Sequence, residues 1–136
     1  MAVSDSSLKV EHLEGTAWQK SRSFSPAVIT EGGRIVWLAG QTTLVDLDGK
    51  DITGMFEAQA RTIFALLGRT LERAGGSLAN MVTMTVFIND GRHGDRFVEI
   101  RNEFFAAGKA PASALLTISN FARPGCVIEI QGVAVI

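Results

Sequence analysis

The passage from residue 55 to residue 88 decides the fold, and it reads MFEAQARTIFALLGRTLERAGGSLANMVTMTVFI. Its first half repeats apolar side chains at the three- and four-residue steps of one helix face, namely Phe56, Ala60, Ile63, Phe64, Leu67, Leu71 and Ala74. Gly75-Gly76 then supplies the left-handed backbone at which helices end. We therefore predict a helix over residues 55–74.

The second half of this passage, residues 81–88, predicts a strand. Its apolar side chains fall on both faces, as the neighbours Met81 and Val82 illustrate. Asn89-Asp90-Gly91 has the composition of a turn and ends the strand. Because a strand that is apolar on both faces needs cover on both sides, we expect it to be central in a sheet.

Patterns on either side of this passage complete the chain. A second helix is predicted over about residues 94–106, with Phe97, Ile100 and Phe104 on one face. Further strands are predicted at residues 27–30, 35–41, 113–118 and 127–136. The first two flank a turn that contains Gly32-Gly33, and we expect them to pair as a hairpin.

The order strand-strand-helix-strand-helix-strand-strand predicts one α+β domain over residues 1–136, in which two helices cover one face of a single sheet. Residues 1–16 are polar and without period, and they are expected to form an N-terminal arm. The second sheet face keeps apolar residues without helices to cover them. The mean hydropathy of +0.21 is also high for a small monomer. Both observations predict that a partner subunit covers this face.

Composition excludes several classes of function. The 136 residues carry 13 basic and 14 acidic side chains, and the net charge of −1 offers no field for nucleic acid. One cysteine and two histidines disfavour a disulfide framework and a His/Cys metal cluster. Apolar runs stay well short of the ~20 residues of a membrane span, and residues 1–20 lack the apolar stretch of a signal peptide. We therefore expect a cytoplasmic protein.

Glu129 is the first candidate for chemistry. In the predicted last strand it shares the second sheet face with Val127, Gln131 and Val133. A carboxylate between valines is costly to bury unless it is paired or functional. Two interpretations remain open, namely a solvated residue of an edge strand and a general acid/base whose pKa is raised by its apolar surroundings.

Arg101 is the second candidate, because it lies about 40° from Phe97 on the helical wheel, within the apolar face of the second helix. Two interpretations remain open here as well. The aliphatic stem can pack on the core while the guanidinium stays in water. Alternatively, the planar guanidinium clamps a carboxylate.

Other polar groups do not form a recognisable site. Three acidic residues have the spacing of a calcium loop, but Lys50 occupies a ligand position and excludes that site. His12 and His93 are isolated and are expected to be solvated. Cys126 is expected to be an inert residue of the core or of a sheet edge.

Four stretches of the chain resemble, in order, segments of the RidA/YjgF family, whose members are also labelled endoribonuclease L-PSP. They are the strand Ile35–Gln41, the helix opening Glu57–Arg61, the helix-to-strand passage Ala74–Val82 with Thr85–Ile88, and the last strand Pro124–Ile130 with Val133–Val135. The resemblance spans about residue 24 to the C-terminus.

This resemblance implies a chorismate-mutase-like α+β subunit and a homotrimer whose sheets line a central barrel, with clefts between neighbouring subunits. It implies hydrolysis of reactive enamines or imines made from amino acids, which yields a 2-keto acid and ammonia without a metal or organic cofactor. In the family, an arginine of a Pro-Ala-Arg-Ser/Thr motif holds the substrate carboxylate. A glutamate of the last strand assists proton transfer and orders the attacking water.

Most of the implied site is present in this chain. Glu129 matches the glutamate, and Gly40 and Gln41 match a glycine and a glutamine of the cleft. Ala39 stands where the family often has serine, so one hydroxyl is lost. Phe24 matches an aromatic residue of the cleft, without a phenolic hydroxyl.

The family's arginine is missing, because Pro111-Ala112-Ser113-Ala114 aligns with the motif and puts Ser113 at the arginine position, followed by Ala114. A hydroxyl in place of a bidentate guanidinium costs carboxylate binding about 2–5 kcal/mol. Arg101 aligns with an asparagine of the second helix that faces the cleft in the family. We therefore hypothesise that Arg101 supplies the positive charge from a different wall, for a small anionic metabolite of different shape.

Three functions follow, and they are kept in this order. The first is hydrolysis of a C=N bond with Glu129 as the acid/base. The second is a non-catalytic trimer that binds a metabolite or a partner protein and regulates another process. The third is RNA cleavage, which the near-neutral charge disfavours.

Overall fold

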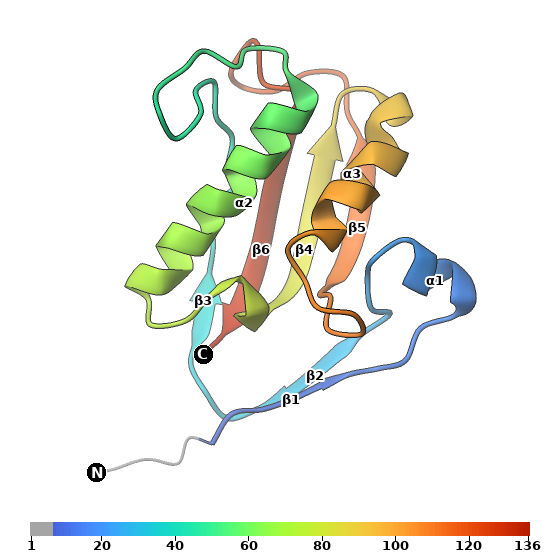
Figure 1. Cartoon of the computed structure of the whole chain (residues 1–136). Coiled ribbons are helices and arrows are strands. Elements are labelled where there is room, and N and C mark those ends of the chain that lie inside the picture. The colour runs from blue at the N-terminus through green and yellow to red at the C-terminus, as the bar shows by residue number, and fades with distance from the viewer. Residues whose placement is uncertain (1–6) are drawn as a thin grey trace.

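Two helices lie side by side on one face of a sheet in the computed structural model, which describes residues 7–136 (Figure 1). Helix α2 spans Phe56–Arg73 and helix α3 spans Gly94–Asn102. The first agrees with the predicted bounds to within one residue at each end, and Gly75 follows it with a φ of 99°. Its predicted apolar face is buried from Phe56 to Leu71.

The main sheet has four strands in the order β3-β6-β4-β5. They are β3 (Ile35–Trp37), β6 (Ile128–Val135), β4 (Met81–Ile88) and β5 (Ala112–Thr117). Strands β4 and β5 are parallel, with α3 in the crossover between them, whereas the other neighbours are antiparallel. This confirms the predicted α+β class and the interior position of residues 81–88.

The two faces of this sheet differ in burial. On β6, Ile128, Ile130 and Ala134 face the helices and are fully buried. Glu129 and Gln131 alternate with them and point to the opposite face. That open face also carries Trp37, which is 77% exposed. The prediction that a partner subunit covers this face therefore keeps its physical basis.

The first two predicted strands do not form a hairpin, and that prediction is wrong. Strand β2 (Val28–Glu31) pairs with β1 (Lys9–His12) in a separate two-stranded sheet, and β3 pairs with β6. Gly32 and Gly33 turn the chain, with φ of 72° and 78°. The pairing with β6 lets Val36 pack against the core, which explains why β3 leaves β2.

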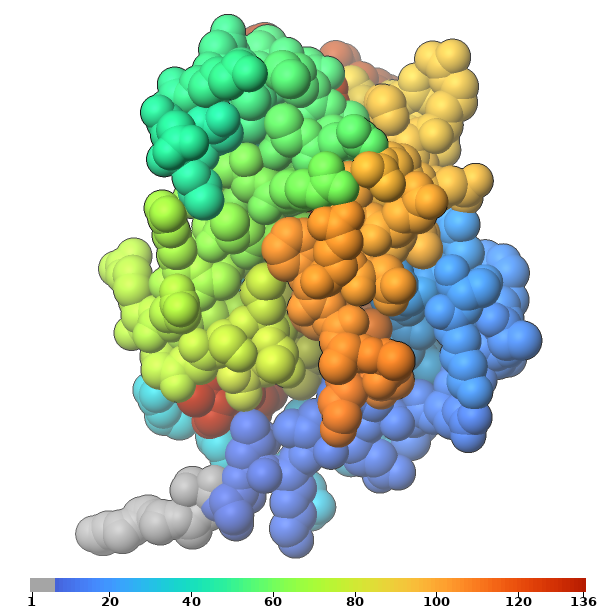
Figure 2. All heavy atoms as spheres, viewed as in Figure 1, coloured from blue at the N-terminus to red at the C-terminus, as the bar shows by residue number. Residues whose placement is uncertain are grey.

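The region before β2 contains two elements without a strong sequence pattern. Strand β1 lies inside the predicted arm, whose residues 1–6 lie outside the described part of the chain. Helix α1 (Ala17–Ser21) follows and begins with a capping box, in which Thr16 and Gln19 exchange side-chain and backbone hydrogen bonds of 3.1 and 2.9 Å. Figure 2 places this N-terminal segment against the loop that follows α3.

Helix α3 ends four residues before the predicted position, for a reason of packing. Phe104 and Phe105 both reach the ring of Phe64, with centroids 4.6 and 6.0 Å away. Neighbouring side chains of a helix diverge by about 100°, so a continued helix would carry only one of them to that ring. The chain therefore leaves the helix after Asn102.

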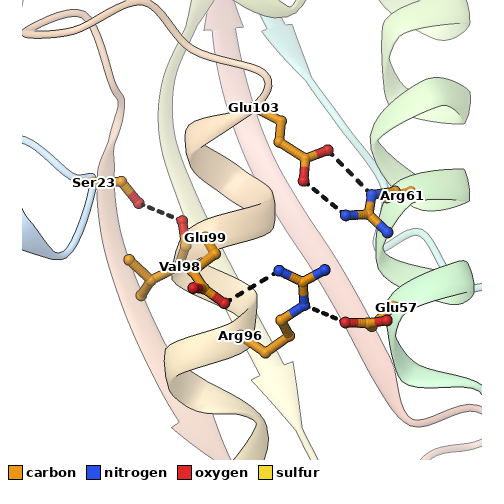
Figure 3. Close-up of polar contacts among 7 residues, drawn as sticks. All are labelled: Ser23, Glu57, Arg61, Arg96, Val98, Glu99 and Glu103. Carbon is orange, nitrogen blue, oxygen red and sulfur yellow. Dashed lines mark hydrogen bonds and ion pairs between the residues drawn. The ribbon is translucent and has the colours of Figure 1, made fainter.

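Charged side chains join α2 to α3 on the solvent side (Figure 3). Arg61 donates two hydrogen bonds to Glu103, and Arg96 contacts both Glu57 and Glu99. The Arg61 contact lowers the pKa of Glu103. Exposed ion pairs stabilise a fold only weakly, so we assign this network the task of aligning the two helices.

Candidate functional site

Arg101 lies at the centre of a polar cluster between α3, β5 and the segment after α1. The residue is only 2% exposed. Its Nη1 donates to Ser113 Oγ at 2.6 Å, its Nε to Ser23 Oγ at 3.2 Å and its Nη2 to the carbonyl of Arg22 at 2.9 Å. The interpretation with the guanidinium in water is therefore wrong. The position where the resemblance places an arginine is reached instead by an arginine from α3.

The charge of Arg101 is not balanced by a carboxylate within residues 7–136. All three contacts of its guanidinium are neutral oxygen atoms. Burial and then the nearby Arg22 cation lower the pKa of Arg101 to about 10, so it stays a cation at neutral pH. The guanidinium carries more N–H donors than these three contacts use. A buried cation with spare donors is a suitable partner for an anionic ligand.

Phe24 completes this cluster from the apolar side. The guanidinium carbon of Arg101 lies 6.0 Å from the centroid of the Phe24 ring and 5.0 Å from that of Phe97. Ser23 donates a further hydrogen bond to the carbonyl of Val98, which ties the segment after α1 to α3 (Figure 3). The structure thus brings together three predicted site residues, namely Phe24, Arg101 and Ser113.

Glu129 forms a second cluster, on the open face of the sheet. Strand β6 lies between β3 and β4, so the interpretation of Glu129 as an edge-strand residue is wrong. Its side chain packs on Gly40, where a Cβ atom would overlap the carboxylate. Within the described residues this carboxylate makes no hydrogen bond or ion pair. It is thus placed on an open surface, next to a backbone that approaches closely, and is available to a ligand.

A β-bulge puts Gly40 beside Glu129. Trp37 pairs with Val133, whereas Gln41 pairs with Ile130, so the chain from Trp37 to Gln41 contains one extra residue. Such a bulge bends the strand and redirects its side chains. Ala39 and Gly40 occupy the bend and are exposed. The Gln41 side chain donates to the carbonyl of Thr42 at 2.8 Å.

The two clusters lie on opposite faces of the sheet within one chain. Ser113 pairs with Met84, and both face the helices. Glu129 pairs with Phe87, which faces the open side. Ala114 follows Ser113 and therefore also lies on the open side, where it is exposed. The predicted site residues are therefore divided into two half-sites that a single subunit does not join.

Three residues of the first cluster were missed by the sequence patterns. Trp18, Arg22 and Ser23 come from α1 and the residues after it. Trp18 and Arg22 line a pocket of about 270 Å³ together with Phe24, Arg101 and Ser113. The signal that could have found α1 is Thr16 followed three residues later by Gln19, the spacing of a capping box.

The remaining candidates have ordinary structural surroundings. The prediction of solvated histidines is wrong, because His93 stacks on Phe56 at 4.2 Å and His12 Nε2 is buried without a hydrogen-bond partner. Burial, and then the charge of Lys109, lower the pKa of His12. Cys126 is 4% exposed. Within residues 7–136, acidic, histidine and cysteine side chains do not gather into a group that could hold a metal ion.

None of the helices described for residues 7–136 combines the length and the apolar character that a bilayer crossing requires.

Comparison with known proteins gives a consistent result over most of the chain. Residues 15–136 match the family model described as endoribonuclease L-PSP. The chain is 30% identical over 112 residues to protein DfrA of Myxococcus xanthus, which covers 82% of this chain and 84% of that protein. A RutC family protein of Pyrococcus abyssi is 26% identical over 75% of this chain and 79% of its own length.

Solved structures of similar fold agree with this match. The crystal structure of RidA from a Psychrobacter species superposes with a TM-score of 0.69 at 28% identity, over 82% of this chain and 87% of that chain. The Rid-family protein YyfB from Yersinia pestis gives a TM-score of 0.76 at 22% identity, over 95% of this chain and 98% of that chain.

Proposed function

This chain belongs to the endoribonuclease L-PSP family, which includes the Rid and YjgF proteins, and on that premise we propose that it hydrolyses C=N bonds of reactive 2-imino acids. The observation that carries the proposal is the buried cation of Arg101, which is held beside Ser113 without a carboxylate partner in residues 7–136. A substrate carboxylate would supply the missing negative charge.

The proposed reaction needs one acid/base and one water molecule. Water attacks the imine carbon, and Glu129 accepts a proton from that water as the C–O bond forms. The resulting carbinolamine receives a proton on nitrogen from the Glu129 carboxyl group. The C–N bond then breaks, ammonia leaves, and loss of the hydroxyl proton gives the 2-keto acid. Glu129 is suited to this task because its carboxylate lies on Gly40 without another partner among the described residues.

The division into two half-sites supports a cleft between subunits. One chain would provide Arg101, Ser113 and Phe24, and its neighbour would provide Glu129 with Gly40. This arrangement would also cover the open sheet face, on which Ile35 and Trp37 are 58% and 77% exposed. We propose a homotrimer as the assembly, because closed cyclic symmetry gives every subunit the same two neighbours.

The test is hydrolysis of an imine that an amino-acid oxidase generates in the cuvette. Semicarbazide competes for the imine, so hydrolysis appears as a slower formation of semicarbazone. The wild type should show activity, and Glu129→Gln should lose about 10²–10⁴-fold in kcat/KM because it removes the acid/base and keeps the shape. Glu72→Gln, which changes an exposed carboxylate on α2, is the matched control and should keep the wild-type rate.

Two results would contradict the proposal in different ways. A Glu129→Gln variant with the wild-type rate would remove Glu129 from the mechanism. A wild type without activity on any imine, but with carboxylate binding at Arg101, would favour the second candidate, a non-catalytic metabolite-binding protein. The absence of the family's arginine from position 113 is the observation that keeps this second candidate.

A further inference from the structure

The pocket at Arg101 has an apolar wall that the carboxylate contact does not use. The pocket lies between α1, α3 and β5, and its volume is about 270 Å³. Beside the polar cluster it is lined by Trp18, Phe24, Val98 and Leu115. This wall could take an apolar group of a substrate whose carboxylate is bound to the guanidinium.

The charges of the pocket call for a single anionic group. Two arginines, Arg22 and Arg101, line it, and acidic residues are absent from its described lining. Arg22 is already paired, since its Nη1 lies 2.6 Å from the carboxylate of Asp95. Arg101 is the cation that keeps an unbalanced charge. One carboxylate therefore neutralises the site, and a second anionic group would have to displace Asp95.

Trp18 gives the apolar wall its aromatic character. The side chain stands at the rim and is 65% exposed, although tryptophan is usually well covered. Its ring meets the edge of Phe24 at 6.0 Å and an interplanar angle of 83°. The capping box at Thr16 fixes the helix that carries it. An exposed indole held from two sides offers a flat contact surface at little cost in conformational entropy.

We propose that the substrate is a 2-imino acid with an aromatic side chain, whose carboxylate binds Arg101 and whose ring packs on Trp18 and Phe24. This inference rests on the imine hydrolysis proposed above and specifies its substrate class. It places the imine carbon at the mouth of the pocket, where the neighbouring subunit would bring Glu129. It also assigns α1 to substrate selection.

The inference can be tested by binding and by kinetics. In the binding experiment, 3-phenylpropanoate and butanoate are titrated into the full chain by calorimetry. The aromatic acid should bind more tightly, and Trp18→Ala should reduce this preference about five- to tenfold, whereas Trp18→Phe should retain most of it. Leu47→Ala removes an exposed apolar side chain from the 45–51 loop and serves as the matched control.

In the kinetic experiment, the imines of phenylalanine and of 2-aminobutanoate are compared by the ratio of their kcat/KM values. The ratio should favour the aromatic imine in the wild type and in Leu47→Ala, and it should fall in Trp18→Ala by the same factor as the binding preference. Imine hydrolysis without any preference, or a preference unaffected by Trp18→Ala, would overturn the inference and leave the proposed function standing. Aromatic preference in binding together with inactivity on both imines would instead refute imine hydrolysis and keep the assigned ligand class.

Discussion

At the scale of single residues, this protein keeps a positive charge where its family relatives are expected to have one, but it brings that charge from another element. Ser113 on β5 has no charge of its own and accepts a hydrogen bond of 2.6 Å from Arg101 on α3. The hydroxyl thus positions the guanidinium. The burial of Arg101 is unfavourable in the free protein, since its contacts are neutral, and an anionic ligand would relieve this cost.

This arrangement predicts a specific response to Arg101→Lys. A lysine keeps the charge but cannot make the planar bidentate contact, so binding of 2-oxobutanoate should weaken at least about tenfold. Calorimetric titration measures the loss, and thermal unfolding without ligand checks that the variant is folded. Arg69→Lys, at an exposed position of α2, should bind like the wild type. Equal affinity in Arg101→Lys and the wild type would exclude a bidentate clamp.

At the scale of elements, the irregular part of the strand that ends at Gln41 matters more than its regular part. The extra residue at Ala39-Gly40 bends the backbone over the Glu129 carboxylate. Glycine is required there because any side chain would enter the space of that carboxylate. A bulge that lies next to a candidate acid/base fits the frequent association of bulges with active sites.

The bulge leads to a prediction for Gly40→Ala. The added methyl group should displace the Glu129 carboxylate, lower kcat/KM about 10- to 100-fold and destabilise the fold by about 1–3 kcal/mol. Imine hydrolysis and urea unfolding measure the two effects. Gly68→Ala is the matched control, because a Cβ there meets Leu78 at an ordinary 3.6 Å. It should raise the stability of α2 and leave the rate unchanged. A fully active Gly40→Ala would mean that Glu129 tolerates displacement.

At the scale of the whole molecule, a shared cleft explains two features at once. The apolar open face needs cover, and the two half-sites lie on opposite faces of the sheet. Contact between the open face of one chain and the Arg101 side of another would satisfy both requirements. The near-zero net charge of −1 allows such close packing without strong repulsion between copies.

A shared cleft predicts that two inactive variants can restore each other. Arg101→Lys and Glu129→Gln subunits, mixed by refolding, should form some clefts with both native residues. Random assembly at equal amounts should restore about a quarter of the wild-type sites. Sedimentation should give three times the chain mass of 14.6 kDa. Mixed samples with the activity of the separate variants, or a monomeric mass, would contradict the shared cleft.

The sequence by itself determined the regular framework. Helix α2, the interior strand β4 and the alternation of Glu129 with buried residues could be predicted, because periodicity reports which side of an element is buried. The family resemblance pointed to Ser113 and Arg101, and the tertiary structure then placed them in contact.

Only the tertiary structure decided which strands pair, where α3 ends and how the site is divided. Strand β3 pairs with β6, nearly one hundred positions away, and a local turn pattern does not report such a partner. The guanidinium of Arg101 is buried because Ser23 and the Arg22 carbonyl, from a segment about 80 residues earlier, close over it. Contacts of this kind depend on packing between distant segments, whereas periodicity records only the environment of each element.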